Sequence, residues 1–295
     1  MKPLIVLTFA LVLLLSSCMR LDNNLFHNTA VSIYLMEANK AQQEITLDVT
    51  YRIPDSLIHL IQLTSDDNGN KATIYAEYLG DRSRIATDTV ILYFHGTRDN
   101  MDYYWNRAKL LANVGGKNRF GVMTIDYRGY GMSGGKPTES GLYADAEAAL
   151  KWLHNNGLSG DRLVVYGFSL GSAPATNRVA NPGVLTPAKL ILEAPFASAA
   201  VMVQDAAVLA MPPSYFTNLK VDNAQEIKKI QQPFMWIHGT ADDFLNINTH
   251  GEVVFKNYHG IYSEAHRING GTHTNVPAVW GIENYKTAIE HFITH

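Results

Sequence analysis

Short, continuous runs of apolar residues recur from residue 90 onward, at 90–94, 122–125, 163–166, 190–192 and 234–237. A strand that is apolar on both faces is buried on both faces, which is typical of a parallel sheet covered by helices. Two more strand-like runs, at 45–51 and 72–78, flank a turn-rich stretch at 65–70. We therefore expect a central sheet whose strands are mostly parallel.

The segments between these runs have helical spacing. Between Leu142 and Leu153 the apolar residues fall at offsets of 0, 4, 7, 8 and 11, and Gly157 stands where a helix C-cap belongs. Apolar residues from Ile282 to Phe292 mark another inward face near the end of the chain. Alternating strands and helices predict an α/β fold, with a doubly wound, mostly parallel sheet flanked by helices. Ligands of such sheets bind beyond the carboxyl ends of the strands.

The N-terminus has a different pattern. After Lys2, an apolar run spans residues 4–15, which is shorter than the ~20 residues of a membrane-spanning helix but suits a signal peptide. The run ends in Leu-Ser-Ser before Cys18, which resembles a bacterial lipobox, where the chain is cut before a cysteine that is then lipidated. An ordinary secretory signal or an uncut anchor is the alternative.

This pattern divides the chain into three parts. We expect a signal peptide at 1–17, a lipid-anchor tether and lead-in at 18–44, and one folded domain at 45–295. Lipidated Cys18 would hold that domain on a membrane of the bacterial cell envelope, because each buried acyl methylene adds ~0.8 kcal/mol of membrane affinity.

Composition narrows the chemistry further. The chain is 46% hydrophobic and 17% charged, with a net charge of -3, so it has a core and lacks the basic bias of nucleic-acid-binding proteins. One cysteine excludes internal disulfides and cysteine metal sites, and no metal-ligand spacing is present. Residues 129–134 fit G-x-G-x-x-G, a dinucleotide-binding string that also occurs as a purely structural loop. We expect neither a cofactor nor a metal.

The clearest candidate chemistry is at Ser169. It is the central residue of Gly167-Phe168-Ser169-Leu170-Gly171, a G-x-S-x-G string between a strand-like run and a helix-like segment. A nucleophilic serine on such a sharp turn projects its hydroxyl above the sheet, and the flanking glycines remove side chains that would clash. A serine hydroxyl is a weak nucleophile and needs an adjacent base. The alternative is a chance glycine-serine turn.

Several strings in this order resemble those of the α/β-hydrolase superfamily, at 93–96, 126–131, 167–171, 237–242 and 270–273. The likeness extends roughly from residue 45 to the C-terminus and is greatest to compact, often membrane-associated serine hydrolases. It implies an α/β-hydrolase fold and catalytic residues in the order Ser, Asp or Glu, His.

The resemblance and the position of each residue predict the base. The chain has 11 histidines, and His273 follows a glycine pair after a strand-like run, where a base can be held over the serine. His266 falls inside that strand, and His291 and His295 lie in the terminal helix or at its end. His273 is therefore the predicted base.

The acid should follow the strand at 234–237. The family pattern places it at Asp242, where it would accept the second N–H of the histidine and hold one tautomer. Asp243 is the adjacent alternative. Its non-catalytic interpretation is a carboxylate that caps the loop or is simply solvated. Glu193, after the preceding strand, is a third candidate because some relatives place the acid there.

An oxyanion hole needs two backbone donors. We expect them to be the N–H groups of Leu170, directly after the nucleophile, and Thr97, in the loop after 90–94. His95 and Gly96 would set the path of that loop. Arg98 could bind an anionic substrate. The alternative is that it is a solvated loop arginine with no role in the site.

Relatives insert their lids between the strands that correspond to 190–192 and 234–237. This segment is short, so we expect a small or absent cap and a fairly open site. The first half of the segment, 197–211, could line an acyl slot with Met202 and Met211, or could be a helix packed on the sheet. An open apolar site on a membrane tether favours a small-molecule acyl ester or thioester as substrate. The alternatives are an amidase or peptidase of the same fold, and a non-catalytic lipid-anchored binding protein.

Overall fold

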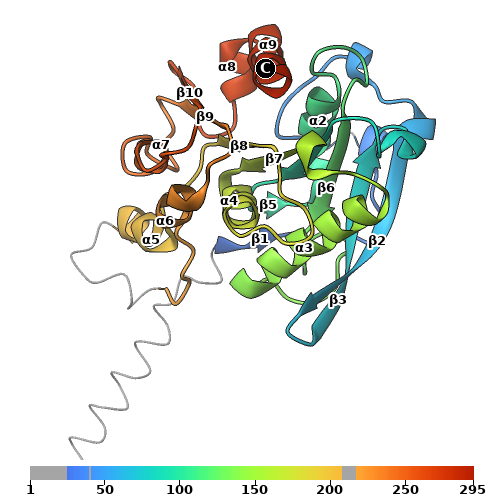
Figure 1. The fold of residues 1–295 in the computed structure, drawn as a ribbon, viewed down its shortest axis with the longest axis horizontal. Helices are drawn as coiled ribbons and strands as arrows, with labels where there is room; N and C mark the ends of the chain where they lie inside the picture. Colours follow the sequence, from blue (N-terminus) through green and yellow to red (C-terminus); the bar gives the residue numbers. More distant parts are fainter. Residues whose placement is uncertain (1–24, 40, 208–216) are drawn as a thin grey trace, which may run out of the picture.

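The computed structural model describes residues 25–39, 41–207 and 217–295, so the predicted signal peptide, Cys18 and Met211 lie outside the described part. One eight-stranded sheet forms its centre, in the order β10-β9-β8-β7-β4-β6-β3-β2 (Figure 1). Strands β10 to β6 in this order are parallel, and β3 and β2 are antiparallel additions at one edge. The strands are β2 (Ile58–Asp67), β3 (Asn70–Leu79), β4 (Val90–Phe94), β6 (Gly121–Asp126), β7 (Leu163–Phe168), β8 (Lys189–Glu193), β9 (Phe234–Gly239) and β10 (Ser263–Ile268).

All five continuous apolar runs lie within strands of this sheet, and 72–78 lies within β3, as predicted. The strand expected at 45–51 is wrong. This stretch is irregular and ends in a 3₁₀ turn at Val49–Tyr51, where the Asp48 side chain accepts a hydrogen bond from the backbone of Thr50. The partner of β3 is β2 instead, which runs through the first half of the turn-rich stretch and turns only at 68–69. Its residues alternate between buried and exposed, because it lies at the sheet edge.

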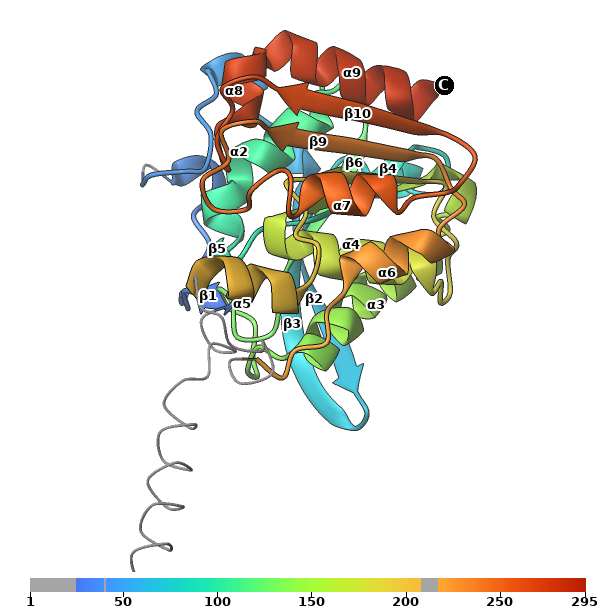
Figure 2. The same ribbon diagram turned by 90° about the vertical axis from the view of Figure 1, so that its left-hand side faces the viewer.

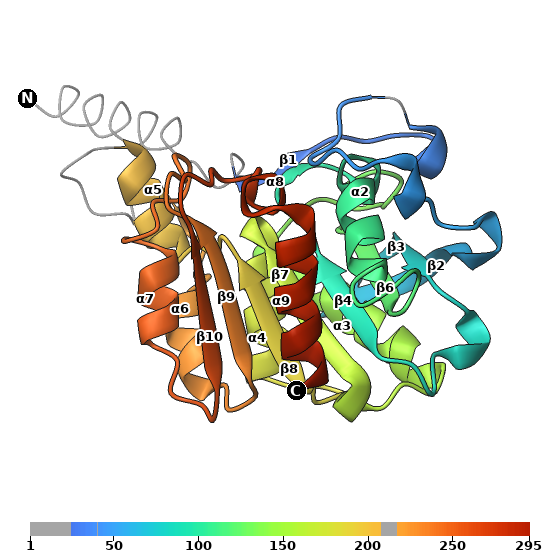
Figure 3. The same cartoon turned by 90° about the horizontal axis from the view of Figure 1, so that it is seen from above.

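Helices cover both faces of the sheet (Figure 3). Along β4, Val90, Leu92 and Phe94 point into a core shared with α3, α4 and α7, while Ile91 and Tyr93 point into a second core shared with α2 and α9. This explains why the buried strands are apolar without alternation. The helices are α2 (Met101–Ala112), α3 (Glu139–Asn155), α4 (Ser172–Ala180), α5 (Ala199–Ala207), α6 (Asn223–Glu226), α7 (Gly251–Lys256), α8 (Val276–Trp280) and α9 (Ile282–Thr294).

The two helical segments singled out in the sequence are α3 and α9. Gly157 follows α3 with φ of +90°, and its N–H bonds to the carbonyl of His154 at 2.9 Å, so it ends the helix in the conformation that favours glycine. Within 25–39, 41–207 and 217–295, no helix is both long and apolar enough to cross a bilayer.

The described part of the lead-in packs on the sheet domain. Strand β1 (His27–Asn28) pairs in parallel with β5 (Arg98–Asp99), directly after the loop that follows β4. Figure 2 shows β1, β5 and α5 gathered beyond the carboxyl ends of the parallel strands. This is the edge of the sheet where the site was expected.

Candidate active site

Ser169 sits on a strained turn between β7 and α4. Its φ is +52°, in the left-handed region that non-glycine residues rarely adopt, and its side chain is nearly buried, with 4% exposed. The glycines on either side are required by close packing. A Cβ on Gly167 would lie 2.6 Å from the carbonyl oxygen of Gly171, and a Cβ on Gly171 would overlap the carbonyl oxygen of Phe94. The turn therefore presses against the end of β4.

The structure brings the three predicted site residues together. Ser169 Oγ lies 2.9 Å from Nε2 of His273, and Nδ1 of His273 lies 2.8 Å from Oδ2 of Asp242. Both are hydrogen-bond distances, so the side chains form a continuous chain from a buried carboxylate to a hydroxyl. Ser169 follows β7, Asp242 follows β9 and His273 follows β10, so the site lies at the carboxyl edge of the sheet.

Asp242 is held by more than His273. Its Oδ1 accepts hydrogen bonds from the backbone N–H groups of Phe244 and Leu245, at 3.0 and 2.8 Å. The buried His238, on β9, places its Nε2 3.1 Å from Oδ2. Burial alone would raise the pKa of Asp242, but the hydrogen bonds from His238 and His273 hold it well below its ordinary value of 3.8. This carboxylate is ionised at neutral pH.

His273 is held between rings. Phe168 lies on one side with its ring centroid 5.3 Å away, and Phe244 packs edge-on at 5.0 Å. The side chain keeps 14% of its surface exposed. The loop that carries it lies close to β9, because Ala241 donates a backbone hydrogen bond to Gly271 at 2.9 Å. The imidazole is therefore fixed in orientation yet open to solvent on one side.

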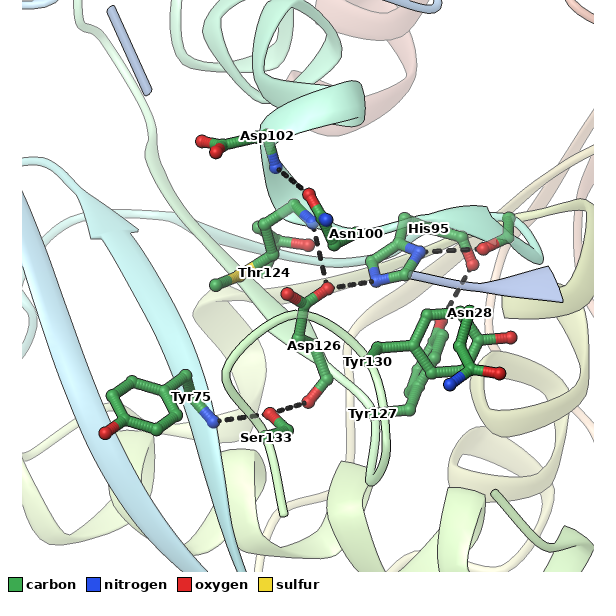
Figure 4. Close-up of polar contacts among 12 residues, drawn as sticks. Asn28, Tyr75, His95, Asn100, Asp102, Thr124, Asp126, Tyr127, Tyr130 and Ser133 are labelled. Carbon is green, nitrogen blue, oxygen red and sulfur yellow. Dashed lines mark hydrogen bonds and ion pairs between the residues drawn. The ribbon is translucent and has the colours of Figure 1, made fainter. Parts of the chain in front are cut away.

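The loop after β4 lies beside Ser169. Thr97 and Leu170 line the same cavity as the serine, which is where two predicted oxyanion donors need to be. The base of the loop is held by His95, whose buried ring bonds Asp126 (Figure 4), with Nε2 3.1 Å from Oδ1. The same ring stacks on Tyr104. His95 thus links the start of this loop to Asp126 at the end of β6.

The cavity at Ser169 has a volume of about 740 Å³. Most of its wall is apolar, and α5 contributes Met202 and Val203, so the first half of the 197–211 segment both lines the cavity and packs on the core. Its polar rim includes two carboxylates, Asp205 and Asp243. The apolar lining residues are Leu25, Leu170, Phe196, Met202, Val203, Phe244 and Leu245.

Within the described residues, none of the alternative site residues forms a hydrogen bond with His273. Asp243 is exposed at the mouth of the cavity. Glu193 is buried away from His273, with Oε2 2.6 Å from Nη1 of Arg107 and 2.8 Å from the hydroxyl of Tyr285. Arg98 directs Nη1 at the hydroxyl of Tyr103, at 3.5 Å. His266 lies inside β10, as predicted.

Three residues at the site were not predicted from the sequence. Leu25 and His27 line the cavity, although the lead-in was interpreted only as a tether. His238 contacts Asp242, although the sequence pattern assigns it no role beyond its place in the string 237–242. Its spacing of four residues before the acid was the one available signal.

The glycine-rich loop at 129–134 contacts the lead-in, because Asn28 donates its side-chain N–H to the carbonyl of Gly129 at 2.6 Å.

Comparisons with known proteins agree with this fold. The chain belongs to the alpha/beta hydrolase family, whose model matches residues 91–273, more than half of its length. It is 29% identical over 173 residues to Alpha/beta hydrolase domain-containing protein 17B of Homo sapiens, and 28% identical to that of Xenopus laevis. The matched region is 56% of this chain and 54% of those relatives, so the chain spans about half the length of the curated relatives it matches.

Solved structures share the architecture. Pyrococcus furiosus esterase Pf2001 superposes with a TM-score of 0.67 at 16% identity, over 91% of this chain and 97% of that one. The Rhodococcus sp. esterase RhEst1 superposes with a TM-score of 0.59 at 16% identity, over 80% and 98% of the two chains. The α/β-hydrolase fold, a mostly parallel sheet flanked by helices, is thereby shown for this protein.

Proposed function

We propose that this protein is a serine hydrolase that cleaves carboxylic esters or thioesters through an acyl-enzyme on Ser169. The observation that carries the proposal is the chain of two short hydrogen bonds from Asp242 through His273 to Ser169, at the wall of an apolar cavity. A serine needs such a base to become nucleophilic, and the base needs an acceptor for its second N–H.

The reaction follows from these positions. Oγ of Ser169 attacks the carbonyl carbon while Nε2 of His273 takes its proton, and Asp242 stabilises the imidazolium that forms. The N–H groups of Thr97 and Leu170 donate to the oxyanion of the tetrahedral intermediate. The intermediate collapses when His273 protonates the leaving alcohol or thiol. Water then attacks the acyl-enzyme with His273 again as the base, which releases the acid and restores the serine.

Substrate class follows from the cavity. Its apolar wall suits an acyl chain, and Met202 can adapt its shape to chains of different length. Two solved structures that share this fold are named as esterases, which agrees with an ester substrate. Their 16% identity to this chain shows only the fold.

The test is hydrolysis of p-nitrophenyl esters from acetate to palmitate by the purified protein, beside Ser169→Ala. We expect turnover that Ser169→Ala reduces by at least about a thousandfold, since only binding and the oxyanion donors then remain. Ser140→Ala, an exposed serine on α3, is the matched control and should keep full activity. Activity on aminoacyl p-nitroanilides alone would replace the esterase by an amidase or peptidase. Full activity of Ser169→Ala would overturn the mechanism.

We also propose that lipidation of Cys18 anchors the protein to a membrane of the bacterial cell envelope. The support is the sequence alone: the single cysteine follows an apolar run at the position that a lipobox requires. Cys18→Ser should move the protein from the membrane to the soluble fraction and leave the kcat of the released protein unchanged. Unchanged membrane retention of Cys18→Ser would instead indicate an uncut anchor.

A further inference from the structure

The side chain of Thr97 is held by the N-terminal part of the chain. Its Oγ1 donates a short hydrogen bond to the carbonyl of Leu25 and accepts one from the backbone N–H of His27 at 3.1 Å. These partners are 72 and 70 residues away in the sequence. Thr97 is the residue whose N–H acts as an oxyanion donor in the proposed mechanism. Its side chain is therefore held in place by a segment outside the eight-stranded sheet.

The same segment continues along the loop. In the β1–β5 ladder, His27 is opposite Arg98 and Asn28 is opposite Asp99. Beyond the ladder, Thr29 donates its hydroxyl to Oδ1 of Asp99 at 2.8 Å and its backbone N–H to the carbonyl of Asp99 at 3.2 Å. Asp99 has φ of +53°, a conformation that is sparsely populated and persists where neighbours fix it. The loop thus takes its shape against residues 27–29.

A second attachment reaches the base of the loop. The hydroxyl of Tyr34 donates to Oδ2 of the buried Asp126 at 2.6 Å and accepts from the backbone N–H of Met132 at 3.0 Å. Oδ1 of Asp126 in turn lies 3.1 Å from Nε2 of His95, as Figure 4 shows. Burial beside Asp126 raises the pKa of Tyr34, so its hydroxyl keeps its proton and remains a donor.

We propose that residues 25–34 form a strap that positions the oxyanion loop, with Thr97 and Tyr34 as positioning residues through which it acts. The inference rests on the proposed function, because it concerns where the loop donates its N–H. An oxyanion donor works only within a narrow distance of the developing charge, and a displacement of about 1 Å can cost roughly a hundredfold in rate. The strap also supplies Leu25 and His27 to the cavity wall.

Thr97→Val tests the first attachment in the full-length protein. It replaces the hydroxyl by a methyl group of similar size and removes the hydrogen bonds to Leu25 and His27, together with a 3.5 Å contact to the hydroxyl of Tyr130. We expect kcat for a p-nitrophenyl ester to fall roughly ten- to a hundredfold with little change in KM. Thr97→Ser keeps the hydroxyl and should restore kcat to within about threefold. Thr64→Val, on the exposed face of β2, is the matched control and should leave kcat unchanged.

Tyr34→Phe tests the second attachment, and it serves if Thr97→Val does not fold, as judged by its melting temperature. It removes only the hydroxyl that bonds Asp126 and Met132. Tyr75→Phe is the matched control, since its ring packs 6.1 Å from that of Tyr34 while its hydroxyl bonds the exposed Gln62. We expect Tyr34→Phe to lower kcat several-fold and Tyr75→Phe to leave it unchanged.

The outcomes separate the two proposals. An active wild type with kcat unchanged in both Thr97→Val and Tyr34→Phe would overturn the strap and leave the hydrolase intact. Failure of Thr97→Ser to restore what Thr97→Val loses would also overturn it, because the hydroxyl would then not be the feature that matters. A wild type without Ser169-dependent turnover would overturn the proposed function and the strap with it.

Discussion

Two buried carboxylates follow neighbouring strands of the sheet, and their surroundings differ. Glu193 ends β8 and meets Arg107, Tyr166 and Tyr285. Asp242 follows β9 and meets two imidazoles and two backbone N–H groups. The sequence offered both as candidates for the acid of the proposed hydrolase, and their partners distinguish them.

The two carboxylates differ in the group that balances their negative charge. The guanidinium of Arg107 is permanently charged and is shared by Glu193 and Glu44, with the Glu44 contact at 2.5 Å, so this cluster ties α2 to the sheet and to the lead-in. An imidazole can gain and lose a proton, so Asp242 can respond to a charge that forms on His273. The partners therefore favour a structural role for Glu193 and the proposed catalytic role for Asp242.

The largest effect should come from exchanging each carboxylate for its amide. Asp242→Asn should lower kcat about ten-thousandfold, because the amide no longer stabilises the imidazolium or holds the same tautomer. Glu193→Gln should change the kcat of the folded protein by less than about tenfold. Steady-state kinetics on one p-nitrophenyl ester would compare them. Equal losses in both variants would break the distinction.

Stability should show the reverse order. Glu193→Gln leaves Arg107 buried with half of its counter-charge, and breaking a buried ion pair by removing one partner costs about 3 kcal/mol. Asp242→Asn retains oxygen acceptors for Phe244 and Leu245 and should cost less. Urea denaturation measures both free energies of unfolding. A smaller loss for Glu193→Gln than for Asp242→Asn would show that the arginine cluster is not structural.

A third histidine near Asp242 should make stability sensitive to acid. His250 is buried directly before α7, and its Nδ1 accepts a hydrogen bond from the backbone N–H of Ala197 at 3.1 Å. Burial lowers the pKa of His250 from 6.5 to about 4, with Asp205 as a partial offset, so the folded state favours the neutral ring. The unfolded chain takes up a proton first, and stability therefore falls as pH drops from 6.5 towards 4, by roughly 2–3 kcal/mol. His250→Asn should flatten the unfolding free energy across this window. An unchanged slope would place the titrating group elsewhere.

The smallest effect should come from the residue beside the acid. Asp243→Asn removes an exposed charge at the cavity mouth and should change kcat/KM for a neutral ester by less than about threefold. A loss comparable to that of Asp242→Asn would mean that the loop can present either carboxylate to His273, and kinetics of the double variant would then measure their exchange.

The parts of the fold that local pattern determines were predictable. Continuous apolar runs gave the buried strands, and the glycines around Ser169 marked a turn that only small residues allow. Edge strand β2 was missed because its alternation is weaker evidence than a continuous run. The contact of Thr97 with Leu25 joins residues 72 positions apart, so the spacing of residues could not reveal the strap. For His238 the four-residue spacing before Asp242 was a signal, but the turn that brings the two side chains together depends on tertiary packing.

In the proposed mechanism, Ser169 carries the acyl group. The most direct measurement is peptide mass spectrometry after treatment with a fluorophosphonate, on the wild type, Ser169→Ala and His273→Ala. We expect one adduct per chain, on the peptide that contains Ser169 in the wild type, none on Ser169→Ala, and labelling slowed at least a hundredfold in His273→Ala. An adduct on another residue, or an unlabelled and folded wild type, would contradict it.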